Sequence, residues 1–250
     1  MSNILIVDLE ATCWDDRPQS VETMEIIEFG CVVADPAGDI LFACSQLVRP
    51  TINSNLSQFC QELTTITQSM AAEAPCYEEA TNLVDTALAG ESFSAWGSWG
   101  QYDYRQIQAE KARHPKRLAP AFFNLPYINL KAAWQETLGK KRKTALRGAL
   151  SHLGLEFEGT QHRALNDAKN IARILPHIPP DKLRKNTINI PRFLVTQAEF
   201  DAVSQEEKGR YNYLIVDDVP MELPRHICAG TGERENTENC IVSRPLNEFE

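Results

Sequence analysis

The chain has 250 residues, of which 43% are hydrophobic and 24% charged, as is usual for a globular protein in water. Its formal net charge of −9 argues against a protein that coats nucleic acid with its whole surface. The longest apolar runs, such as residues 4–7, are far shorter than the roughly 20 residues of a membrane-spanning helix, and no basic segment precedes a cleavable apolar one. We therefore expect a cytoplasmic protein without membrane contact.

Three extended segments open the chain. Residues 4–10 and 26–34 are apolar and rich in β-branched side chains, and residues 40–48 follow across the turn sequence at 35–39. We predict three strands, the last two forming a hairpin.

Helical and extended patterns then alternate. Between 80 and 88 the apolar residues repeat with helical spacing ahead of Gly90, which is typical of a helix with a glycine after its end. The other predictions are a strand over 93–96, a helix over about 103–113, a short strand near 127–130, a helix ending at Leu138 before Gly139, a helix capped by Thr144 and ended by Gly154, and a last core helix over about 165–175. This order predicts a mixed α/β layer fold.

Prolines 176, 179, 180 and 191 indicate a linker, so we predict a main domain over 1–178 and a C-terminal extension over 179–250. In the extension, residues 196–199 have the spacing of a capping box for a short helix and 211–216 have strand composition, whereas 229–239 are mostly polar. Because the extension has few apolar residues, we expect it to pack on the main domain or on a second copy, which would make a homodimer possible.

The seven cysteines are odd in number, scattered and never spaced as C-x-x-C. Neither a disulfide framework nor a structural zinc site is indicated. We expect reduced thiols, most of them buried.

Two carboxylates stand at the end of the first predicted strand. Residues two apart on a strand project from the same face, so Asp8 and Glu10 would lie side by side. Such a pair repels itself unless a cation intervenes. The alternative is a strand that simply runs out into solvent.

Three further residues extend this pattern. Asp103 begins a predicted helix, where an aspartate also serves as an ordinary N-cap. Asp167 lies on the apolar side of its helix, where an unpaired carboxylate would be costly and a cation would be a suitable partner. His162 enters the same helix and would otherwise be an ordinary surface histidine. Brought together, four carboxylates and one imidazole are the groups that a two-metal phosphodiesterase requires.

The motifs around these residues resemble a known family. The chain is similar to the DEDDh branch of the DnaQ-like 3′-to-5′ exonucleases, which have an RNase H-like fold, and within it to the Eri-type, histone-mRNA 3′-exonuclease subgroup. The likeness covers about residues 3–176. It rests on residues 8–13, 25–30 and 169–174, on Phe59-Cys60, and on Leu63-Thr64 with Ile66-Thr67.

The resemblance implies an RNase H-like mixed sheet flanked by helices, followed by the C-terminal extension. It also implies that Asp8, Glu10, Asp103 and Asp167 hold two Mg²⁺ ions, for which Mn²⁺ can substitute, and that His162 deprotonates the attacking water. Nucleoside 5′-monophosphates would leave one at a time from a free 3′ end of single-stranded or overhanging RNA or DNA, with RNA favoured.

The resemblance further implies that the backbone around Leu9, Ala11 and Thr12 meets the terminal sugar and that Phe59 and Tyr102 stack around the terminal base. A role for both aromatics in the core is an equally good interpretation. Asn166 stands where relatives often carry a second aspartate, and we expect this loss to be tolerated because the ligand role belongs to Asp167.

Positive charge gathers in the middle of the chain. Between residues 101 and 147 there are eleven lysines and arginines but three acidic residues. Residues 140–143, with Arg147 and residues 116–117, could follow a phosphate backbone, although such runs are more often solvated loops. Two other functions remain open: a DNA-directed exonuclease of the proofreading or repair type, and a binding module without turnover.

Overall fold

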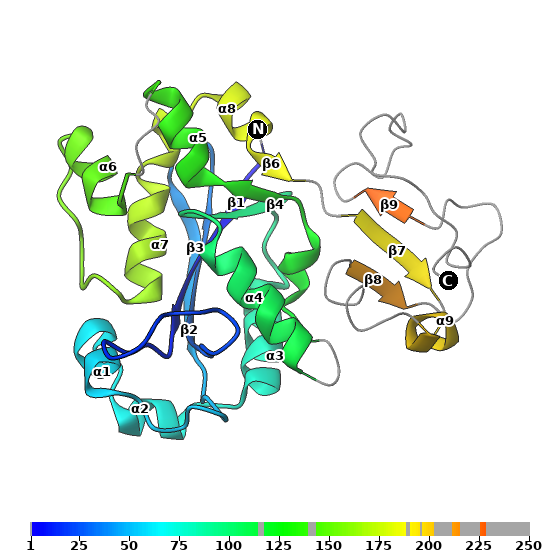
Figure 1. The fold of residues 1–250 in the computed structure, drawn as a ribbon. Coiled ribbons are helices and arrows are strands. Elements are labelled where there is room, and N and C mark those ends of the chain that lie inside the picture. The colour runs from blue at the N-terminus through cyan, green and yellow to red at the C-terminus, as the bar shows by residue number, and fades with distance from the viewer. Residues whose placement is uncertain are drawn as a thin grey trace.

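The computed structural model describes residues 2–114, 118–139, 144–188, 191–195, 197–202, 212–215 and 226–228 (Figure 1). A six-stranded sheet in the order β3-β2-β1-β4-β5-β6 forms its centre. The strands are β1 (Ile4–Ala11), β2 (Ile26–Ala34), β3 (Ile40–Leu47), β4 (Ala95–Ser98), β5 (Tyr127–Asn129) and β6 (Thr187–Ile188). β1, β4 and β5 are parallel, whereas β2 pairs antiparallel with both β1 and β3, and β6 antiparallel with β5. The predicted mixed α/β fold is confirmed.

Helices cover both faces of the sheet (Figure 1). Alternate residues of β1 point to opposite faces. Ile4 and Ile6 pack with α5 (Leu130–Thr137), α6 (Leu146–His152) and α7 (Ala164–Ala172). Leu5, Val7 and Leu9 pack with α3 (Tyr77–Leu88), α4 (Tyr102–Arg113) and the 3₁₀ turn η1 (Ala121–Asn124). Asp8 and Glu10 continue the series of Ile4 and Ile6, so they belong to the face that α7 covers.

Two short helices that the sequence analysis did not predict close one end of the sheet. They are α1 (Gln58–Thr64) and α2 (Gln68–Glu73). Each begins at a hydroxyl cap: Ser57 Oγ accepts the amide of Cys60 at 2.9 Å, and Thr67 Oγ1 accepts that of Met70 at 3.2 Å. They form a third apolar cluster with the ends of β1 and β2.

Two predictions of position were wrong. The strand predicted at 93–96 lies at Ala95–Ser98. A glycine is more typical of a turn than of a strand, but Gly97 is buried within β4. The backbone of β5 approaches it so closely that an added Cβ would lie 2.8 Å from the carbonyl oxygen of Ile128. The N-cap of α6 is Ala145, without a side-chain hydrogen bond, rather than Thr144.

The chain after residue 175 continues the core before it forms a second sheet. The 3₁₀ turn η2 (Leu175–His177) and α8 (Pro180–Lys185) pack against the α7 side of the sheet through Leu175 and Leu183. A separate three-stranded sheet, β8-β7-β9, is made of β7 (Pro191–Val195), β8 (Asn212–Ile215) and β9 (His226–Cys228), and α9 (Gln197–Ala202) follows β7. The predicted strand at 211–216 corresponds to β8. Thr196 and residues 229–239 lie outside the described residues, and the division at 178 stays a prediction.

Five cysteines of the main sheet and its helices are free thiols, and three of them, Cys13, Cys31 and Cys60, are buried as expected. No described helix combines the length and apolar composition needed to cross a membrane.

Candidate active site

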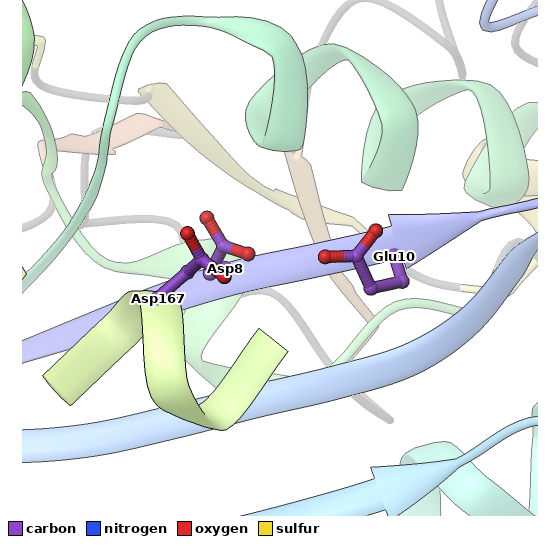
Figure 2. A group of neighbouring side chains, drawn as sticks. All are labelled: Asp8, Glu10 and Asp167. Atoms are coloured by element: carbon purple, nitrogen blue, oxygen red, sulfur yellow. The ribbon is translucent and has the colours of Figure 1, made fainter. Parts of the chain in front are cut away.

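Three carboxylates converge on the face of the sheet that α7 covers. Asp8 and Glu10 come from β1 and Asp167 from α7, and Figure 2 shows the three side chains gathered there. Each can offer one oxygen such that all these atoms lie within 4.8 Å of one another. Asp8 is half-buried, while Glu10 and Asp167 are each 8% exposed. Three close, desolvated carboxylates form a set of hard oxygen ligands that suits a divalent cation such as Mg²⁺.

Asp103 contacts the same strand from α4. It lies in the first turn of α4, but Gln101 is the N-cap residue, so the capping interpretation of Asp103 is not supported. Instead Asp103 Oδ1 accepts the amide of Leu9 at 3.1 Å, between Asp8 and Glu10 in the chain. Asp103 therefore borders the group of three carboxylates without being part of the 4.8 Å set.

Burial and repulsion from nearby carboxylates raise the pKa of every one of these groups. Burial is the main cause throughout; it raises the pKa of Glu10 to about 9, with repulsion from Asp167 next in importance. For Asp103 and Asp167 the pKa rises to about 6, because hydrogen bonds offset part of the burial. The pKa of Asp8 also lies well above its usual value, owing to burial and then to Asp103 and Glu10. Such a site favours either protons or metal cations.

His162 holds an uncommon backbone conformation at the entrance to α7. Its φ of +59° lies in the left-handed region, which non-glycine residues seldom adopt and which recurs at functional sites. Its amide donates to Asp167 Oδ2 at 2.9 Å, so the two predicted site residues are linked. Burial lowers the pKa of the half-buried imidazole below 6.5, which keeps it neutral and able to accept a proton at pH 7.

Asn166 stabilises the loop that carries His162. Its side-chain amide donates to the carbonyl oxygen of Thr160 at 3.1 Å, and it packs so closely on Gly159 that a Cβ there would lie 2.7 Å from Asn166 Cγ. Asn166 thus has a structural role in this loop.

An ion pair that was not predicted from the sequence anchors α7. Arg163 donates through Nε and one terminal nitrogen to Glu28, both at 3.0 Å, and the amide of Ala164 donates to Glu28 Oε2 at 3.1 Å. Glu28 lies on β2 and is 1% exposed. A charged residue inside an otherwise apolar strand was the available signal, because a buried carboxylate requires a partner.

The residues predicted to contact substrate differ in their surroundings. Leu9, Ala11 and Thr12 are buried, and the amides of Leu9 and Thr12 already donate to Asp103 and to the carbonyl of Glu25. Phe59 is half-buried and packs in the cluster of α1 and α2. Tyr102 is 39% exposed and adjoins Asp103 in the chain. Tyr102 is thus the better placed of the two aromatics to contact a base.

Most of the basic run cannot be assigned to a surface. Residues 116–117 and 140–143 lie outside the described residues, while Arg147 is exposed on α6.

Comparisons with known proteins show which family the chain is similar to. The profile of the exonuclease family RNase T matches residues 5–175. The 3′-5′ exonuclease eri1 of Schizosaccharomyces pombe is 30% identical over 198 residues, covering 69% of this chain and 66% of that protein. Human 3′-5′ exoribonuclease 1 is 33% identical over 181 residues, covering 68% of this chain and 50% of that protein. The chain therefore spans only half to two thirds of the length of these relatives.

A solved structure is similar over the same region. The nuclease domain of 3′hExo, described as a DEDDh family member bound to rAMP, superposes with a TM-score of 0.65 at 30% identity. The match covers 73% of this chain and 94% of that domain.

Proposed function

Because the chain belongs to the RNase T exonuclease family, a family of 3′-5′ exonucleases that includes DEDDh members, we propose that it is a metal-dependent 3′-to-5′ exonuclease. Its substrate is a single-stranded or overhanging nucleic acid with a free 3′ end, and its products are nucleoside 5′-monophosphates. The observation that carries the proposal is the convergence of Asp8, Glu10 and Asp167 within 4.8 Å.

Four carboxylates hold the metal. Asp8, Glu10, Asp103 and Asp167 supply the oxygen ligands for two Mg²⁺ ions, or for Mn²⁺ in their place. When bound, such a pair of cations stabilises both the attacking and the leaving oxygen of an in-line displacement at phosphorus. The raised pKa values of these carboxyl groups support the assignment, since cations would relieve the repulsion that raises them.

His162 is the general base. The lowered pKa of its imidazole leaves a free ring nitrogen at neutral pH, which takes the proton of the attacking water. The hydrogen bond from its amide to Asp167 fixes the loop relative to the carboxylates. The left-handed backbone of His162 is held by the same contact.

Substrate contacts involve the end of β1 and the two aromatics. Leu9, Ala11 and Thr12 form the wall for the terminal sugar, and the amide and the hydroxyl oxygen of Thr12 hold this wall against Glu25. Tyr102 and Phe59 stack on the terminal base without reading its sequence. RNA is the favoured substrate because a relative is named an exoribonuclease and a similar structure binds rAMP.

The test is release of mononucleotides from oligonucleotides labelled at the 3′ terminal nucleotide. Purified full-length protein with Mg²⁺ or Mn²⁺ is expected to release them one at a time, and matched RNA and DNA oligomers of one sequence measure the preference. Asp8→Asn should abolish release while circular dichroism and oligonucleotide binding persist. A folded wild-type protein that binds RNA and releases nothing would instead identify a binding module.

A further inference from the structure

A cavity outside the carboxylate site opens beside Tyr102. Its volume is about 580 Å³, within the range of roughly 300–1,000 Å³ that small-molecule sites occupy. Three separate segments line it: residues 19–22 after β1, residues 100–102 with Arg105 at the start of α4, and Asn129, Lys131, Ala132 and Gln135 at the start of α5. The carboxylate chemistry described above does not use this space.

The sheet topology favours an anionic ligand in this cavity. β4 and β5 are parallel neighbours, and α4 and α5 begin directly after their carboxyl ends. Ligands of α/β sheets commonly bind outside the carboxyl ends of the strands. Two helix starts also present amide groups and the positive ends of two helix dipoles. At the start of α5, Asn129 Oδ1 accepts the amide of Ala132 at 3.0 Å, and at the start of α4 the carboxylate of Asp103 accepts its own backbone amide.

The charged side chains that line the cavity are mainly positive, so they too favour an anion. Arg105 and Lys131 line it together with a single acid, Glu22. The side chain of Lys131 lies along Gly100, where an added Cβ would be 3.6 Å from Lys131 Cδ. The guanidinium of the exposed Arg105 donates to the neutral Gln101 Oε1 at 3.4 Å. Within the described part of the chain neither cation forms a salt bridge.

Tyr102 connects the cavity to the carboxylates. It lines the cavity and precedes Asp103 in the chain. Asp103 in turn accepts the amide of Leu9 at 3.1 Å, so the start of α4 adjoins the stretch of β1 that carries Asp8 and Glu10. A strand whose terminal phosphodiester sits at the carboxylates would therefore have its preceding nucleotides within reach of the cavity.

We propose that this cavity binds the phosphodiester backbone immediately upstream of the scissile bond, with Arg105 and Lys131 as its phosphate contacts. The inference rests on the proposed exonuclease function and assigns the strand path on one side of the site. It makes Arg105 and Lys131 determinants of affinity for an extended strand, not participants in the chemical step.

The experiment compares a substrate that has an upstream strand with one that lacks it. The variant Arg105→Gln/Lys131→Gln removes both charges, and Arg49→Gln/Arg184→Gln removes two exposed charges that do not line the cavity. On a single-stranded RNA octamer the first variant should raise KM about tenfold with little change in kcat. On the p-nitrophenyl ester of a nucleoside 5′-monophosphate, kcat/KM should stay within about twofold of wild type, and the control variant should resemble wild type on both.

Binding is measured separately from turnover. In the Asp8→Asn background, fluorescence anisotropy of a labelled octamer gives Kd at several salt concentrations. Loss of two phosphate contacts should lower the magnitude of the slope of log K against log salt by about 1.4, since single strands give about 0.7 per phosphate.

Three outcomes overturn the inference. An unchanged KM and salt slope would exclude the cavity from the strand path. An equal loss on the ester and the octamer would place the two residues in the chemical step. Tighter binding of a free mononucleotide than of the octamer at the cavity would identify a small-molecule site. If wild-type protein hydrolyses neither substrate, the proposed function fails, and the anisotropy series still decides on the cavity.

Discussion

Gly30 and Ala164 are closer than any side chain at position 30 would permit: an added Cβ would lie 2.1 Å from the backbone carbonyl carbon of Ala164. Gly30 is also the partner of Asp8 in the antiparallel pairing of β1 and β2. The start of α7 therefore rests on the sheet directly beside the first carboxylate. This contact sets the separation between Asp8 and Asp167, which lies one turn further along α7.

Gly30→Ala should displace the start of α7. We expect a loss of roughly 1–3 kcal/mol or more in the free energy of unfolding, as for other overpacked sites, and a larger fall in nuclease activity because the carboxylates separate. Thermal unfolding and oligonucleotide hydrolysis measure the two effects. Gly148→Ala is the matched control: it lies in α6 with only an ordinary contact to Thr144, so it should be neutral or stabilise by about 0.5–1 kcal/mol. Equal behaviour of the two variants would contradict the role of Gly30.

The Glu28–Arg163 ion pair should contribute more to the free energy of unfolding than an exposed ion pair does. Arg163→Met leaves a carboxylate that is 1% exposed without its guanidinium partner. We expect a cost of about 3 kcal/mol, at the lower end of the range for broken buried pairs, because Arg163 itself is 28% exposed. Lys185→Met, which breaks the more exposed pair with Glu136, should destabilise the protein much less because solvent screens that pair. Chemical denaturation of both variants makes the comparison, and a cost of the same size in each would argue against an anchoring role for Glu28.

Metal-free protein should become less stable as pH rises. The pKa of Asp103 and of Asp167 is raised to about 6 and that of Glu10 to about 9, from ordinary values of 3.8 and 4.5. Between these pKa values the folded state holds protons that the unfolded state has released. The stabilisation from these carboxyl groups is therefore fully present below about pH 4 and is lost as the pH rises through about 6 toward 9. Mg²⁺ binds deprotonated carboxylates. The difference between the Tm in Mg²⁺ and the Tm in a chelator should therefore increase with pH.

Scanning calorimetry in chelator and in excess Mg²⁺ across this pH range measures both trends. Glu10→Gln should flatten the metal-free trend above about pH 6, because the group whose pKa is about 9 is gone. A Tm gain from Mg²⁺ that is independent of pH would show that the cation does not replace protons at these carboxylates.

His162→Asn should separate the chemical step from metal binding. Asparagine tolerates the left-handed φ of +59° and keeps the amide that donates to Asp167, but it has no ring to accept a proton. We expect kcat to fall by about 10²–10⁴, while Mg²⁺ stabilises the variant as it does the wild type. Single-turnover hydrolysis and the Tm shift with Mg²⁺ provide the readouts. Retention of near wild-type kcat would exclude His162 as the base.

The parts of the fold that could be predicted are those with long periodic patterns. β1, β2, β3 and α3 follow from alternation or helical spacing, and the carboxylates of β1 and α7 were identified because charge interrupts those patterns. α1 and α2 could not be predicted, since each is under two turns and is stabilised by a single hydroxyl cap and by packing on distant strands.

Contacts between distant segments were the other omission. The structural roles of Gly30 and Glu28 arise only when α7 packs on β2, and no local sequence pattern specifies that packing. Position 97 illustrates the same limit. Its glycine permits the close approach of β5, but in a sequence a glycine is more typical of a turn than of a strand. The cavity beside Tyr102 likewise combines three segments that are far apart in the sequence.

Anomalous X-ray diffraction tests whether the carboxylates of β1, α4 and α7 share paired divalent cations. The crystals contain the 250-residue chain and are grown with Mn²⁺ and a nucleoside 5′-monophosphate. We expect two manganese peaks roughly 3.5–4 Å apart, bounded by Asp8, Glu10, Asp103 and Asp167. Carboxylates that stay free of metal while the nucleotide is bound elsewhere would contradict it.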